Sequence, residues 1–266
     1  MLPSLGDRNM HMIHFYSLML ALLFGLAAGL VGCFALMKRL LLASDVISHL
    51  ALPGLAVALL LKKNPMVGAA ATLFLGVLLV WRLQRKTGLA TEAMIGVVFA
   101  TALAIGAALT PREDLVEALF GAFQDISLSA FLLGLAATLF VIFFIFRLED
   151  RLVLSLFSPE LAAATGVNVS RLDLYFLVLF SLTVLVGLRF MGALLASALI
   201  IMPAATGRQL TGKISHFLLV GSAASVVSVL LGYSLATFVL KTTTVGPMIV
   251  MVSAALFGLS LVRRMD

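Results

Sequence analysis

Two ionisable side chains, Asp45 and His49, lie in the largely apolar segment SDVISHLALPG (44–54). Because they are four residues apart, a helix would place both on one face, one turn from each other. A carboxylate oxygen and an imidazole nitrogen that converge can bind zinc or manganese, and the same two groups can relay protons. An Asp at mid-membrane costs about 2.5 to 3.5 kcal/mol. That cost favours a functional interpretation of the pair.

A structural interpretation of the same residues stays open. Ser44 and Asp45 could cap the helix near the inner membrane surface, and His49 could bond a neighbouring carbonyl. Pro53 and Gly54 follow one turn later, where a proline removes a backbone hydrogen bond and kinks the helix. Pro203, in IIMPAATGRQL, is a second such point. We expect these three residues to be kinks beside a translocation pathway.

The stretch SPELAAATG (158–166) has the pattern of a short capped helix. Ser158 suits the N-cap and Pro159 the first helical position, while Glu160 complements the positive helix end. Gly166 is placed to terminate the helix. About two turns are too few to span a membrane, so we predict a connector on the cytoplasmic side, on which a soluble partner could push.

The elements that must position these residues are predicted from composition. Of the 266 residues, 62% are hydrophobic and 11% charged, and the mean hydropathy is +1.19. Uncharged runs recur at about 15 to 27 residues, long enough for a helix to cross a hydrocarbon core of about 30 Å. The sequence predicts one all-α, multi-pass membrane domain over residues 1–266. About nine spans are expected, at 15–37, 45–61, 65–81, 91–110, 127–146, 172–188, 190–207, 215–240 and 243–262.

The basic residues predict how these spans are oriented. With the N-terminus outside and the C-terminus inside, the inner loops hold twelve of the 18 Lys and Arg. These are Lys38, Arg39, Arg82, Arg85, Lys86, Arg147, Arg151, Arg171, Arg208, Lys213, Arg263 and Arg264. The positive-inside rule favours this orientation. Carboxylates at span ends, such as Glu92 and Asp173, are expected to be solvated or to cap helices.

Several functions are excluded or disfavoured by the sequence. No G-x-x-x-x-G-K-[ST] phosphate loop occurs, so we do not expect an enzyme, and any ATP hydrolysis belongs to a partner. The net charge of +6 is spread over span ends, a pattern that sets topology and does not indicate nucleic acid. The single cysteine, Cys33, excludes an intrachain disulfide. Small residues in GLAAGLVG (25–32) and GALLASALIIMPAATG (192–207) predict close helix packing.

Three segments together resemble the permease subunit of metal-ion ABC importers, the bacterial family that takes up zinc, manganese or iron(II). They are LLASDVISHLALPGLAVALLL (41–61), the stretch 158–210 with GALLASALIIMPAATGRQL, and EALFG (117–121). The zinc-uptake branch is the most similar. The resemblance implies a homodimer in the bacterial inner membrane, two cytoplasmic ATP-binding subunits and an extracytoplasmic metal-binding protein. It implies no permanently bound cofactor, only a transported divalent ion, most simply zinc.

The resemblance also assigns roles to residues. Asp45 and His49 match an acidic-x-x-x-His pair that lines the ion pathway and would form a transient metal site. PELAAATG matches the coupling helix that contacts the ATPase. Compared with the E-A-A-x-x-x-G motif of ABC importers in general, this chain keeps Glu160, Ala162 and Gly166 but has Leu161 in the middle. It also lacks the later I-x-L-P of that motif.

Three other functions fit the sequence less well. In a proton-coupled secondary transporter, Asp45 and His49 would carry protons, but the capped cytoplasmic helix would have no purpose. A permease for metal chelates would usually be longer, with ten spans. A purely structural membrane protein would leave the Asp and His unexplained.

Overall fold

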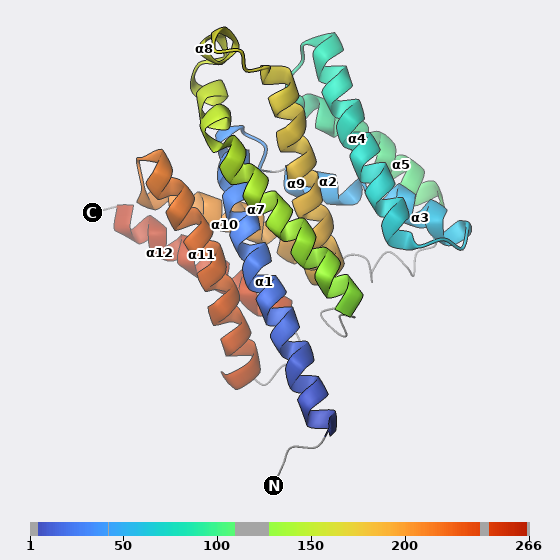
Figure 1. The fold of residues 1–266 in the computed structure, drawn as a ribbon, viewed down its shortest axis with the longest axis vertical. Helices are drawn as coiled ribbons and strands as arrows, with labels where there is room; N and C mark the ends of the chain where they lie inside the picture. Colours follow the sequence, from blue (N-terminus) through green and yellow to red (C-terminus); the bar gives the residue numbers. More distant parts are fainter. Residues whose placement is uncertain (1–4, 42, 110–127, 240–244, 265–266) are drawn as a thin grey trace.

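The computed structural model describes residues 5–41, 43–109, 128–239 and 245–264 (Figure 1). Every element in these ranges is helical, which confirms the all-α prediction for this part of the chain. The helices are α1 (Leu5–Met37), α2 (Ala43–His49), α3 (Leu52–Leu60), α4 (Pro65–Thr87), α5 (Thr91–Leu109), α7 (Leu128–Phe157), α8 (Pro159–Ala164), α9 (Val169–Met191), α10 (Ala193–Leu210), α11 (Ile214–Ser234), the π-helix η1 (Leu235–Val239) and α12 (Val245–Arg264).

Six helical segments are long and apolar enough to cross a membrane. They lie in α1, α4, α7, α9, α11 with η1, and α12. Three shorter apolar segments, Ala43–Ala58, Thr91–Ile105 and Leu194–Leu210, coincide with the other three predicted spans. The nine-span count and the orientation therefore stay predictions.

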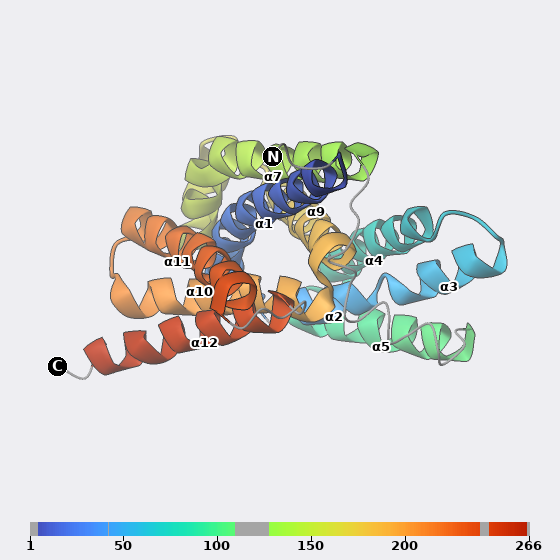
Figure 2. The same ribbon diagram turned by 90° about the horizontal axis from the view of Figure 1, so that it is seen from below.

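Helix α1 runs through the middle of the molecule (Figures 1 and 2). It packs against α7, α9, α10 and α11, whereas α3, α4 and α5 pack together on the other side of α9. Helix α2 contacts α5, α9 and α10, so it lies where the two groups of helices meet. The core reflects this arrangement, because Phe24 and Phe34 of α1 and Phe176 and Phe180 of α9 are fully buried.

Small residues bring the central helices together, as the sequence predicts. A Cβ added at Gly29 of α1 would lie 2.7 Å from the Cα of Ser222 in α11. A Cβ added at Gly32 would overlap the backbone carbonyl of Ile200 in α10. Larger side chains at these glycines would force the helices apart.

The connection between α9 and α10 is a single residue, Gly192. Its φ of 84° lies in the left-handed region, which side chains with a Cβ rarely adopt. Arg189, Phe190 and Met191 belong to α9, and the predicted boundary between the sixth and seventh spans lies within two or three residues of the observed one.

Candidate functional site

Asp45 lies on α2, which Figure 2 shows between α5 and α10. Its side chain is exposed, although Ala43, Ser44, Ile47 and Ser48 on the same helix are buried. The structure gives this carboxylate no hydrogen bond or ion pair with any residue that it describes. Helix α2 is therefore fixed by its neighbours, with a free carboxylate on its open side.

His49 ends α2, one turn after Asp45. It is half-buried, and its ring contacts the ring of Phe99 in α5 with 5.9 Å between the centroids. Among the described residues it makes no hydrogen bond to a carbonyl. The aromatic contact restricts the orientation of the imidazole.

The observed geometry differs from the interpretation in which Ser44 and Asp45 cap the helix. Helix α2 begins at Ala43, so both residues lie inside its first turn. The Ser44 hydroxyl donates to the Leu41 carbonyl at 2.8 Å, and the Ser48 hydroxyl donates to the Asp45 backbone carbonyl at 2.6 Å. These serines satisfy backbone carbonyls, whereas the Asp45 carboxylate has no bond to any residue in the described ranges.

The predicted second span is not one continuous helix. It breaks at Leu50 and Ala51, whose N–H groups donate to the carbonyls of Ile47 and Ser48, three residues back. Pro53 lies in the first turn of α3 and has no N–H to donate to the His49 carbonyl. At the expected kink the regular α-helix is thus interrupted for two residues between α2 and α3, immediately after His49.

Gly54 and Pro203 differ in what they do locally. Gly54 packs against Gly68 of α4 so closely that a Cβ on either would overlap the carbonyl of the other. Pro203 lies inside α10, which continues unbroken from Ala193 to Leu210. Gly54 therefore holds α3 against α4, and Pro203 does not end its helix.

The short helix predicted over 158–166 is α8, at the opposite end of the molecule from the N-terminus (Figure 1). The Ser158 hydroxyl accepts from the Leu161 N–H at 3.3 Å, and Pro159 occupies the first turn. Gly166 follows with a φ of 82°. Ala162 is fully buried, whereas Glu160 and Leu161 are exposed. Helix α8 therefore presents a charged and an apolar side chain outward from a fixed base.

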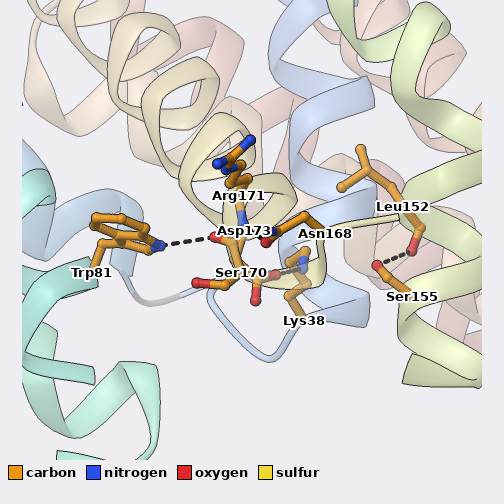
Figure 3. A network of polar contacts seen from close by, with 8 residues as sticks. All are labelled: Lys38, Trp81, Leu152, Ser155, Asn168, Ser170, Arg171 and Asp173. Carbon is orange, nitrogen blue, oxygen red and sulfur yellow. Dashed lines mark hydrogen bonds and ion pairs between the residues drawn. The ribbon is translucent and has the colours of Figure 1, made fainter. Parts of the chain in front are cut away.

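Polar contacts hold the start of α9, directly after α8 (Figure 3). The Lys38 ammonium at the end of α1 lies 2.6 Å from the Asp173 carboxylate. The Trp81 Nε1–H of α4 donates to the Ser170 carbonyl at 2.8 Å. The expectation of a solvated or capping Asp173 is wrong, because this carboxylate pairs with a lysine 135 residues away in the sequence.

The sequence-predicted residues fall into two groups. Asp45, His49, Pro53 and Gly54 lie together on α2 and the start of α3. The residues from Ser158 to Gly166 lie at the end of the molecule that carries α8, which we call the α8 end. The structure does not describe EALFG (117–121). The sequence does not single out Lys38 and Trp81, because a Lys or Trp at a span end is common and gives no sign of its partner.

Curated relatives match most of the chain. The manganese transport system membrane protein MntC of Halalkalibacterium halodurans is 30% identical over 245 residues, which cover 90% of this chain and 83% of the relative. The high-affinity zinc uptake system membrane protein ZnuB of Haemophilus influenzae is 28% identical over 258 residues, covering 95% and 98%.

Two solved structures share the fold. PsaBC from Streptococcus pneumoniae in complex with Fab matches with a TM-score of 0.78 at 24% identity, over 94% of this chain and 91% of that one. An inward-facing conformation of a putative metal-chelate type ABC transporter matches with a TM-score of 0.74 at 18% identity, over 98% and 91%. The model of the ABC 3 transport family matches residues 10–264. With that match over nearly its whole length, the chain belongs to the ABC 3 transport family.

Proposed function

We propose that this chain is the permease subunit of an ATP-driven importer of divalent transition-metal ions, with zinc as the first candidate and manganese or iron(II) as the others. That the chain is a multi-pass permease subunit of a metal-ion ABC importer follows from the family and from relatives named for manganese and zinc. In the proposed complex, two permeases face two cytoplasmic ATPases, and an extracytoplasmic binding protein delivers the ion.

The exposed carboxylate of Asp45 is the observation that carries this proposal. A charged group within an apolar helical bundle is costly unless water or a polar partner reaches it. Asp45 has neither ion pair nor hydrogen bond to the described residues of its own subunit. We infer that the open side of α2 faces a second copy of the chain across a hydrated route for a cation.

The number of ligands supports a transient site shared by two subunits. Within the described residues, no three His, Cys, Asp or Glu side chains lie close enough to hold a metal ion. One Asp and one His per subunit are fewer than the four ligands of a structural zinc site, which suits a site that releases the ion it binds. This pair does not by itself separate zinc from manganese. Zinc is placed first because the sequence resembles the zinc-uptake branch most.

Helix α8 is the proposed contact with the ATPase. ATP binding would close the two ATPases, move the two α8 helices together and switch the permeases between outward-open and inward-open states. The capped ends of α8 and its exposed Glu160 and Leu161 suit a rigid contact surface.

The charges at the α8 end support an inside location for it. Cavities at this end are lined by basic residues from α1, α7, α9, α10 and the start of α11. They are Lys38, Arg39, Arg151, Arg171, Arg208 and Lys213, all expected on the inner side. Positive residues gathered at one end of a bundle mark the cytoplasmic face.

The test is metal uptake by proteoliposomes that hold the chain, its ATPase and a loaded binding protein. We expect ⁶⁵Zn to accumulate with ATP and unlabelled zinc to compete better than manganese. Preferred uptake of ⁵⁴Mn would keep the permease function and change the ion. Uptake that ignores ATP and follows a proton gradient would contradict the proposal and favour a secondary transporter.

A further inference from the structure

The junction between α8 and α9 is rigid on both sides of its turn. The Asn168 side chain accepts from the Arg171 N–H at 3.0 Å and so caps α9, as Ser158 caps α8. Between the caps, the Gly166 N–H donates to the Ala163 carbonyl and the Val167 N–H to the Ala162 carbonyl, both at 3.0 Å. A displacement of α8 is therefore passed to the first turn of α9 with little slack.

The next turn of α9, which carries Asp173, is tied to the end of α1 by the ion pair of Lys38 and Asp173 (Figure 3). The side chains are 11% and 30% exposed, so the pair is largely shielded from solvent. The Lys38 ammonium also lies 5.5 Å from the centre of the Phe176 ring. The Lys38–Asp173 pair is the one ion pair between residues that the structure describes. Removing one partner would leave the other charge poorly solvated.

Lys38 is directly followed by the turn that leads to α2. Arg39 has a φ of 60°, in the left-handed region that residues other than glycine rarely occupy. The Leu40 N–H donates to the Ala35 carbonyl at 2.7 Å, and Leu40 is buried. Arg39 and Leu40 thus lie shortly before Ala43, where α2 begins, and Asp45 follows two residues later.

A second contact joins the start of α9 to α4. The Trp81 Nε1–H donates to the Ser170 carbonyl, and the Arg85 guanidinium lies 4.9 Å from the centre of the Trp81 ring. Helix α4 packs on α3, which follows the break after His49. The start of α9 is thus linked to the end of α1, which precedes α2, and to α4, which packs on α3. The ion pair with Lys38 is the link that lies closer to Asp45 along the chain.

We propose that the ion pair between Lys38 and Asp173 transmits movement of α8 to the turn between α1 and α2, and so sets the position of Asp45 and His49 in step with the ATPase. This inference rests on the proposed function. Lys38 and Asp173 do not touch the metal ion in this scheme and act as positioning residues. Losing the pair would let the ATPase cycle without moving α2.

The test compares metal ions transported with ATP molecules hydrolysed by the full complex in proteoliposomes. In Lys38→Met and Asp173→Asn we expect this ratio to fall at least fivefold while ATP hydrolysis continues. The exchange of charges, Lys38→Asp with Asp173→Lys, should restore at least half of the ratio. Arg171→Met is the control, because Arg171 is an exposed basic residue on the same turn of α9 and should leave the ratio unchanged.

A ratio equal to wild type in both neutral variants would overturn the inference and leave the proposed function intact. A purely structural role would lower transport and hydrolysis together with the amount of assembled complex, at an unchanged ratio, and would also overturn it. If the neutral variants do not assemble, Asp173→Glu decides, because it keeps the charge and adds one methylene to the link. We then expect a ratio about half that of wild type or lower, and an unchanged ratio contradicts the inference. A wild-type complex without ATP-dependent transport would instead refute the proposed function itself.

Discussion

A carboxylate within a membrane is stable only where water or a polar partner reaches it. Asp45 is exposed on its own subunit. His49, one turn further along α2, contacts the ring of Phe99 in α5. The sequence predicts the pair because Asp and His are rare in apolar spans and their spacing is one helical turn. It does not predict that α2 ends at His49, since that depends on how Pro53 is accommodated by α4 and α5.

Single glycines decide how closely α3 lies against α4. In Gly54→Ala the new Cβ would meet the Gly68 carbonyl, so the helices must separate. Overpacking of this kind costs about 1–3 kcal/mol. We expect a lower midpoint of thermal unfolding for the purified permease, by about 2–4 °C for each kcal/mol. The matched control is Gly96→Ala, because nothing lies within 4 Å of its added Cβ. Equal midpoints for the two variants would contradict this packing.

At the scale of elements, hydropathy predicts membrane crossings better than helix ends. Helix α7 runs from Leu128 to Phe157, eleven residues beyond the predicted end at 146. The extra turns carry charged residues that a hydropathy profile excludes, although a helix continues readily into water. The end of α8 is predicted within two residues from its local capping pattern, because caps are decided by neighbours in the sequence. The π-helix η1 has no such local signal.

Helix α8 is expected to bind the ATPase through its exposed apolar side chain. Leu161→Asp would place a charge at that contact, and we predict at least tenfold weaker binding of the purified ATPase to the permease in nanodiscs. Leu89→Asp is the control, because Leu89 and Leu161 are each 53% exposed and Leu89 follows α4. Equal loss of binding in both variants would contradict the prediction that the ATPase binds through Leu161 of α8.

At the scale of the whole molecule, the sequence does not predict which residues far apart in the chain contact each other. The sequence predicts Lys38 only as a basic residue of an inner loop and Asp173 only as an acid at a span end. Their pairing requires that the end of α1 lies beside the start of α9. The same holds for Trp81 and Ser170. The gathering of basic residues at the α8 end is different, because the positive-inside rule predicts it from span order alone.

Membrane orientation has a direct labelling test. In sealed vesicles with the native outside exposed, a membrane-impermeant maleimide should label Lys63→Cys, in the turn between α3 and α4. It should label Gly212→Cys, between α10 and α11, only after permeabilisation. Both positions are exposed, and the unmodified chain is the blank because Cys33 is buried. The reverse labelling pattern would contradict the N-outside, C-inside orientation.

The central claim, that Asp45 and His49 line the route of the ion, is tested most directly by metal uptake in the variants Asp45→Asn and His49→Gln. Both would be measured for ⁶⁵Zn and ⁵⁴Mn in proteoliposomes with the ATPase and binding protein, beside Glu92→Gln, which neutralises an exposed acid in the first turn of α5. We predict that ATP-dependent uptake falls at least tenfold in the two α2 variants, with the complex still assembled, and is unchanged in Glu92→Gln. Full uptake in both α2 variants would contradict the account and leave Asp45 and His49 with structural roles only.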